Sequence, residues 1–256
     1  MDEFPLHRHY LHYSELPYSQ RVLYTATLLV IGFAYILALL QIYFTYAGRA
    51  GGNPKMVSYN DIVVGYSGNK SGSRLETALR GPMSGMLSSD DRQVIFTWLA
   101  DGSSRETYDK QIKSIIDSQC MACHGGDNPH RADFSDYDKL KKMTAVDTGP
   151  TVATLVRVSH IHLFGLTFIF FIMGLMFSNA YARPVWLKCT VIAAPFAAIL
   201  IDVSSWYIIR YFNPFAIVEI IAGMVMAACF AFMWLVTMYQ LWFKPTPALV
   251  AKRSPE

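Results

Sequence analysis

Charged residues are scarce in this sequence. Asp, Glu, Lys and Arg make up 16% of its 256 residues, whereas an average soluble domain carries about 25%. Hydrophobic residues make up 53%, which excludes a disordered chain and leaves too little charge for the surface of an ordinary cytosolic globule. The composition therefore indicates a membrane protein.

Two further shortages exclude other classes of protein. The formal net charge is only +3, which is too small to indicate a protein that binds nucleic acid. Cysteine occurs four times, which is too sparse for a fold that disulfides hold together. The positions of the cysteines therefore matter more than their number.

Four apolar runs are long enough to cross the roughly 30 Å of hydrocarbon in a bilayer. They cover residues 22–46, 158–177, 189–209 and 215–243. Such a run can also be a buried helix of a soluble core, but four in one chain favour membrane helices. The first run is too long for a cleaved secretory signal, so we expect it to be an anchor.

Lys and Arg near the ends of the spans predict the orientation. If residues 1–21 and 244–256 are cytoplasmic tails, the short outside loop has only Arg210 at its edge. The inside segments then contain Arg8, Arg21, Arg183, Lys188, Lys244, Lys252 and Arg253. We therefore predict a multi-pass protein with both termini in the cytoplasm and residues 47–155 on the outer side.

Residues 47–155 form one long insert between the first and second spans. It holds 13 Lys and Arg and also 13 Asp and Glu, so it gives little hint of a strongly charged partner. Its length suits one small domain. We expect an all-α protein in which a small, mostly helical extracytoplasmic domain is inserted between the first two of four transmembrane helices.

One motif in the insert points to chemistry. Cys120, Cys123 and His124 form a C-x-x-C-H sequence. Two thiols at this spacing can each form a thioether with one vinyl group of a haem, while the histidine coordinates the iron. A thioredoxin-like pair does not require the histidine, and a zinc site needs two more ligands, whereas Cys189 and Cys229 lie inside spans. The motif predicts one covalently bound haem c, with His124 as the proximal iron ligand.

The motif and its surroundings resemble the c-type cytochromes, over roughly residues 75–143. Isoleucines at helical spacing in residues 108–119 are similar to the helix that leads into a cytochrome c haem site. Gly125, Gly126 and residues 132–137 resemble the loop and short helix that follow it. Since haem is attached on the outer face of bacterial membranes, the resemblance implies a bacterial inner membrane protein with a periplasmic haem domain.

The two halves of the resemblance stand in swapped order. A distal methionine and a last helix should follow the motif, but after Met143 the chain soon enters the membrane. Residues 81–100, upstream, are similar to the methionine loop and the amphipathic last helix, with Ser89 or Asp90 as its N-cap. The chain ends of the ordinary fold lie close together, which permits a circular permutation. Residues 101–104 would be the new joint.

The resemblance implies that a methionine is the sixth iron ligand. Met83 is the preferred candidate, and Met86 is the second. His160 and His162 lie at the outer mouth of the second span, where they could reach a haem resting on the membrane, and His130 follows the motif by a few residues. An open sixth position is the remaining alternative. The choice matters because a thioether ligand tends to raise the reduction potential.

Four residues in or beside the spans are further candidates. His160 and His162 point to nearly opposite faces of a regular helix, so they can share a copper or other metal ion only if the helix begins after them. Asp202 in the third span indicates a quinone site or a proton relay, because ionisable residues are costly there. Arg210, about two helical turns on, can share its face. A salt bridge or a polar contact between helices is the alternative.

These observations predict a membrane-anchored monohaem c-type cytochrome that transfers single electrons. Four spans exceed what a tether requires, so we expect membrane lipid and integral membrane redox subunits as partners, with a quinone or a soluble cytochrome or copper protein exchanging electrons. Nucleic acid is not expected, and the spans resemble an uncharacterised group of bacterial four-span cytochromes. A subunit is favoured over a stand-alone enzyme. The alternatives are quinol oxidation with Asp202 as proton acceptor, and a haem-based redox or gas sensor with a vacant sixth site.

Overall fold

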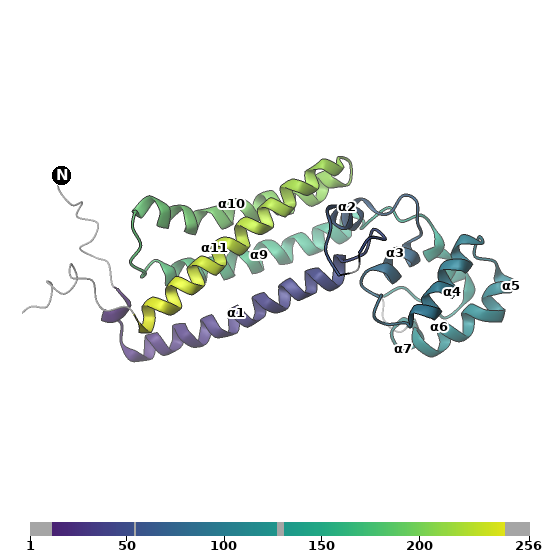
Figure 1. Cartoon of the computed structure of the whole chain (residues 1–256), viewed down its shortest axis with the longest axis horizontal. Helices are drawn as coiled ribbons and strands as arrows, with labels where there is room; N and C mark the ends of the chain where they lie inside the picture. Colours follow the sequence, from purple (N-terminus) through teal and green to yellow (C-terminus); the bar gives the residue numbers. More distant parts are fainter. Residues whose placement is uncertain (1–11, 54, 127–130, 244–256) are drawn as a thin grey trace, which may run out of the picture. The chain divides into compact units, whose positions relative to one another are not determined.

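The computed structural model describes residues 12–53, 55–126 and 131–243 (Figure 1). Within these ranges the chain is helical, apart from turns, loops and one isolated bridge between Ser73 and Val146. It divides into two compact units. The bundle unit comprises Met1–Ala38, Ala153–Trp206 and Ile217–Glu256, and the insert unit comprises Leu39–Val152 and Tyr207–Ala216.

Four helices are long and apolar enough to cross a membrane. They are α1 (Tyr18–Tyr46), α9 (Val152–Phe177), α10 (Val185–Ile209) and α11 (Ala216–Trp242). The predicted all-α class with four transmembrane helices is confirmed. The first three helices begin before the expected limits at 22, 158 and 189, because backbone hydrogen bonding continues past the point where the apolar run ends.

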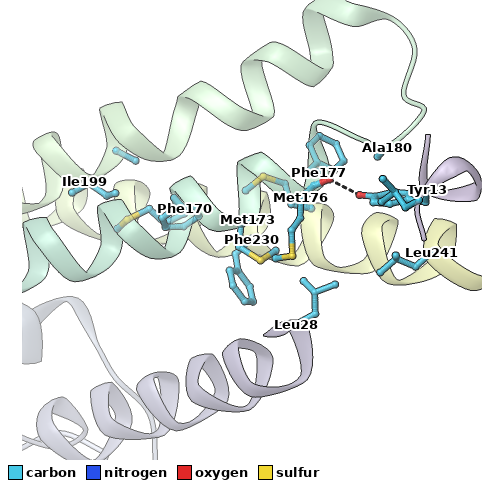
Figure 2. Packing of buried hydrophobic residues seen from close by; sticks show 14 of the residues in the cluster. Tyr13, Leu28, Phe170, Met173, Met176, Phe177, Ala180, Ile199, Phe230 and Leu241 are labelled. Atoms are coloured by element: carbon cyan, nitrogen blue, oxygen red, sulfur yellow. Dashed lines mark hydrogen bonds between the residues drawn. The ribbon is translucent and has the colours of Figure 1, made fainter. Parts of the chain in front are cut away.

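Large apolar side chains fill the core of the bundle unit (Figure 2). Phe170 and Phe177 of α9 are almost completely buried, and Phe230 of α11 stacks on Tyr35 of α1 with ring centroids 4.1 Å apart. The phenol of Tyr13 donates to the carbonyl of Met176 at 2.7 Å (Figure 2). Contacts from all four long helices and from the segment before α1 thus make this unit one packed body.

The insert unit is built from short helices around its own core. Apolar side chains of α3, α4, η3 and α6 fill that core, with Ile95, Trp98, Ile112 and Ile116 nearly inaccessible to solvent. The elements in chain order are α2 (Tyr59–Ser67), α3 (Arg74–Arg80), α4 (Ser89–Ala100), α5 (Arg105–Thr107), the π-helical turn η3 (Tyr108–Ile112), α6 (Lys113–Gln119), α7 (Met121–His124), α8 (Tyr137–Lys141) and η4 (Lys142–Thr144).

The two ends of the insert meet at a pair of glycines. Gly68, which follows α2, and Gly149, which precedes α9, both have positive φ, +78° and +73°. A Cβ added at Gly68 would overlap the backbone of residues 147–149. Glycine is therefore required at this crossing for its conformation and for its lack of a side chain.

The loop between α10 and α11 belongs to the insert unit. The phenol of Tyr59 donates to the carbonyl of Asn213 at 3.0 Å, and a guanidinium N–H of Arg210 donates to the carbonyl of Pro150. This loop, which includes η5 (Asn213–Phe215), thus packs on the rest of the insert unit.

The predicted N-cap of α4 is wrong, whereas a loop and a short helix do follow the motif. The N-cap of α4 is Ser88, not Ser89 or Asp90, because Ser88 Oγ accepts from the Asp91 N–H at 3.1 Å and donates to its carboxylate at 2.8 Å. Residues 132–136 form a loop, and α8 begins only at Tyr137.

Residues 101–104, which the sequence predicts to join the two permuted halves, form the turn between α4 and α5. Gly102 and Ser103 both have positive φ, +84° and +56°. The indole N–H of Trp98 donates to the carbonyl of Ser104 at 2.9 Å, which fixes the turn to α4. Beyond it, α5, η3 and α6 form one helical segment that packs on α4 and runs to Gln119, as predicted for residues 108–119.

Candidate functional site

The C-x-x-C-H motif lies where α6 ends and α7 begins. Cys120 is both the C-cap of α6 and the N-cap of α7. Its carbonyl accepts a hydrogen bond from the His124 N–H at 2.9 Å. Cys120 packs partly buried against the insert core, whereas Cys123 is exposed. Both thiols are free. One helical turn therefore holds two thiols and an imidazole together, with one sulfur at the core and the other at the surface.

Hydrogen bonding fixes the tautomer of His124. Its Nδ1 lies 2.6 Å from the carbonyl oxygen of Ala132. A carbonyl can only accept, so Nδ1 carries the proton and donates, which leaves the lone pair on Nε2. The ring also stacks on Phe134, with centroids 4.3 Å apart and an interplanar angle of 9°. His124 is thus oriented to offer Nε2 as a metal ligand.

The loop that carries Ala132 is itself anchored. The carboxylate of Asp133 forms an ion pair with Lys139 at 2.7 Å and accepts from the Ser135 N–H at 2.8 Å. These contacts, with Lys139 the largest, lower the pKa of Asp133 to about 2 and raise the pKa of Lys139. Gly126 has a φ of +93°, and a Cβ there would lie 3.0 Å from the Asp133 carboxylate. The acceptor of the His124 proton is therefore held in place.

The environment of Cys120 disagrees with a thioredoxin-like role. Burial raises the pKa of the Cys120 thiol. Nucleophilic cysteines of C-x-x-C redox motifs have lowered pKa values instead. The thiol of Cys120 therefore stays protonated at neutral pH.

The candidates for a sixth ligand are placed very differently. Met83 is half-buried against the core that Cys120 also contacts, whereas Met86 is 65% exposed. His160 and His162 belong to α9 in the bundle unit. His130 lies outside the described residues. Of these side chains, Met83 is the one that shares a core with the motif.

Several contacts around the motif have no signature in the sequence. The Gln119 amide, directly before Cys120, donates to the Asp91 carboxylate at 2.8 Å, which joins the motif to the start of α4. This bond and the one from Ser88 lower the pKa of Asp91. The acceptor for His124 is a backbone carbonyl, which any residue type could supply. Only Phe134, as an aromatic residue near the motif, offered a visible signal.

Comparison with known proteins concerns the last three long helices. Residues 148–248 match the model of a family described as a transmembrane helical domain (Aq_1264_TM). This part of the chain is similar to that transmembrane helical domain. The match includes all of α9, α10 and α11 and does not extend to the motif. No curated protein and no solved structure matches the chain.

His160 and His162, which the sequence offers as a possible metal pair, both lie within α9. Helix α9 begins at Val152 and runs unbroken through His160 and His162, so the predicted alternative of a helix that starts after them is wrong. His162 Nδ1 lies 3.0 Å from the Val158 carbonyl oxygen. The His162 ring also forms a T-shaped contact with the Trp206 ring, with centroids 5.1 Å apart. Among the described residues, no three His, Cys, Asp or Glu side chains cluster as a metal site.

Asp202 of α10 lies inside the bundle unit. It is 7% exposed, and its backbone carbonyl accepts from Ser205 Oγ at 2.6 Å. Arg210 belongs to the insert unit, where its guanidinium donates to the Pro150 carbonyl. At 7% exposure, the Asp202 carboxyl group is enclosed among the helices of the bundle unit.

Proposed function

We propose that the chain is a membrane-anchored monohaem c-type cytochrome that transfers single electrons, as a subunit of a larger membrane redox complex. The observation that carries this proposal is the orientation of His124. Its Nδ1 proton is committed to the Ala132 carbonyl at 2.6 Å, so Nε2 is the free ligand atom, directly after two free thiols. When bound, the haem would supply one-electron chemistry at its iron.

The donor set suits a covalently held haem. Cys120 and Cys123 would hold it by thioethers, and His124 would ligate the iron from a ring that Phe134 keeps from rotating. A metal ligand held by a backbone carbonyl and a stacked ring needs little reorganisation when the iron changes oxidation state. Because Cys123 is exposed, the side of the haem attached to it would be accessible to a redox partner.

The membrane part supports a subunit rather than a simple carrier. One span would suffice as a tether, but four helices are long and apolar enough to cross the bilayer. Only 6% of the most apolar window of α1 is buried within the chain. Lipid and integral membrane subunits are the surfaces that would cover it. The positive-inside pattern supports cytoplasmic termini and an insert on the outer side. Covalent haem attachment outside the cytoplasm would then make the membrane a bacterial inner membrane and the insert periplasmic.

Covalent haem attachment tests the proposal directly. The full chain is expressed in a bacterium that attaches haem in its periplasm, and the intact mass is measured after denaturation. We expect the mass to increase by one haem, and we expect the Cys120→Ser, Cys123→Ser double variant to lose it. The matched control is Cys189→Ser with Cys229→Ser, which changes the two cysteines of the spans and should keep the haem. A wild-type chain without covalent haem would refute the proposal.

Quinol oxidation by this chain is the second candidate, and one observation favours it. The Asp202 carboxyl is enclosed in the bundle and forms no ion pair in the described part of the chain. A carboxyl in such a place is suited to accepting a proton. The test is haem reduction by a short-chain quinol in the isolated chain. Loss in Asp202→Asn but not in Glu219→Gln would support this candidate, and equal rates in both variants would exclude it.

A further inference from the structure

The loop of the preferred sixth ligand is tied to α4 by a single arginine side chain. Arg92 is in the first turn of α4, and its guanidinium Nη1 donates to the carbonyl of Ser84 at 2.7 Å. Ser84 follows Met83 directly. We propose that Arg92 is a positioning residue that holds the loop of residues 81–87 closed, so that Met83 occupies the sixth position of the iron. This inference rests on the proposed function.

Besides the packing of Met83 and Leu87 on the insert core, the loop has local backbone hydrogen bonds. The Met83 N–H donates to the Ala78 carbonyl, that of Ser84 to the Gly81 carbonyl, and that of Met86 to the Met83 carbonyl, at 2.9 to 3.1 Å. Such turns break and reform easily when they are exposed. The Arg92 contact differs because it joins the loop to another element, eight residues on, with a charged donor.

The helix that carries Arg92 is a rigid support. Ile95 and Trp98 of α4 are 1% exposed in the insert core. The neighbouring residue, Asp91, accepts from Gln119 at 2.8 Å, and Gln119 stands directly before Cys120. The support of the methionine loop and the haem-attachment segment are therefore joined across α4 and α6.

The positive charge of Arg92 lies in the first turn of α4. The first turn of a helix favours anions, as Asp90 and Asp91 illustrate, and disfavours cations. The Arg92 side chain is half-buried and reaches back to the Ser84 carbonyl. A backbone carbonyl that accepts from a guanidinium offsets the unfavourable position of the charge.

Removing Arg92 should open the sixth position without removing the haem. In Arg92→Ala, the closed loop loses its charged tie, and we expect the open form to increase roughly tenfold relative to the wild type. Arg92→Lys keeps one donor but loses the forked geometry, so we expect an intermediate effect. The matched control is Arg105→Ala, because Arg105 also lies in a first helical turn of the insert but contacts the ring of Tyr137.

Two measurements on the full chain in mild detergent test this role. The first is carbon monoxide binding to the reduced protein. The thioether-to-iron absorption band of the oxidised protein is recorded for the same variants. Met83→Ala should lose the band and bind carbon monoxide fully, Arg92→Ala should bind it roughly tenfold more tightly than the wild type, and Arg105→Ala should match the wild type. The second is amide hydrogen exchange over residues 81–87, which should be faster in Arg92→Ala than in Arg105→Ala.

The outcomes separate this inference from the proposed function. If haem is attached and Met83→Ala loses the band, but Arg92→Ala behaves like Arg105→Ala in both measurements, the positioning role of Arg92 is overturned alone. If Met83→Ala keeps the band, or the reduced wild type binds carbon monoxide freely, the role is overturned because Met83 does not fill the position. If the wild type carries no covalent haem, the proposed function and this inference both fail.

Discussion

The stack between Phe134 and His124 predicts a large loss of stability when the phenyl ring is removed. Phe134 is 6% exposed, contacts the insert core and lies parallel to the His124 ring at 4.3 Å. Truncation of a buried phenylalanine to alanine costs about 3 to 5 kcal/mol. We expect about 3 kcal/mol for Phe134→Ala, the lower end, because one face of the ring covers a half-buried imidazole rather than a closed core.

The conservative variant divides this loss into its parts. Phe134→Leu keeps most of the apolar volume and removes the aromatic pair, which contributes about 0.5 to 1.5 kcal/mol beyond its buried area. We therefore expect a loss of about 1 kcal/mol for leucine. The remaining difference between the two variants measures the cavity that alanine leaves.

Urea titration followed by brief proteolysis suits a chain with a membrane part. In mild detergent, the protease should report the unfolding of the insert while the spans stay protected. With a urea dependence of about 2 kcal/mol per M, the midpoint should fall by about 1.5 M for Phe134→Ala and by about 0.5 M for Phe134→Leu. Equal midpoints for the two variants, or a fall of less than about 0.3 M for alanine, would refute the packing that we describe around His124.

Three more predictions use the same proteolysis assay. Gly68→Ala should destabilise the insert by more than about 2 kcal/mol, because its Cβ overlaps the backbone of residues 147–149. Gly102→Ala, at a similar φ but with no atom within 4 Å of the added Cβ, should cost only about 1 kcal/mol. Equal losses would contradict the close approach of Gly68 to residues 147–149. Trp98→Phe should cost about 1 to 3 kcal/mol, since the Ser104 carbonyl loses its donor; an unchanged midpoint would exclude that bond. The lowered pKa of Asp133 predicts stability that is complete above its ordinary value and is lost as pH falls toward 2, so that Asp133→Asn should abolish this part of the pH dependence; an identical acid profile would show that the ion pair with Lys139 does not stabilise the loop.

The sequence alone determined the class of the fold and the position of the chemistry. Length and hydropathy suffice to predict four membrane helices, because only helices with internally satisfied backbones of this length cross hydrocarbon in an all-α protein. The spacing of the isoleucines before Cys120 likewise predicts the helix over residues 108–119. The C-x-x-C-H pattern locates the candidate site because its residue types and spacing carry the chemistry themselves.

Tertiary structure decided the details that depend on backbone groups and on distant segments. The acceptor for His124 is the Ala132 carbonyl, and the acceptor for Arg92 is the Ser84 carbonyl. Neither has a signature in residue type, because every residue has a carbonyl group. The enclosure of Asp202 and the unbroken course of α9 through His160 and His162 also follow from packing and backbone hydrogen bonds. Hydropathy records how apolar a segment is, whereas its contacts depend on which other segments fold against it.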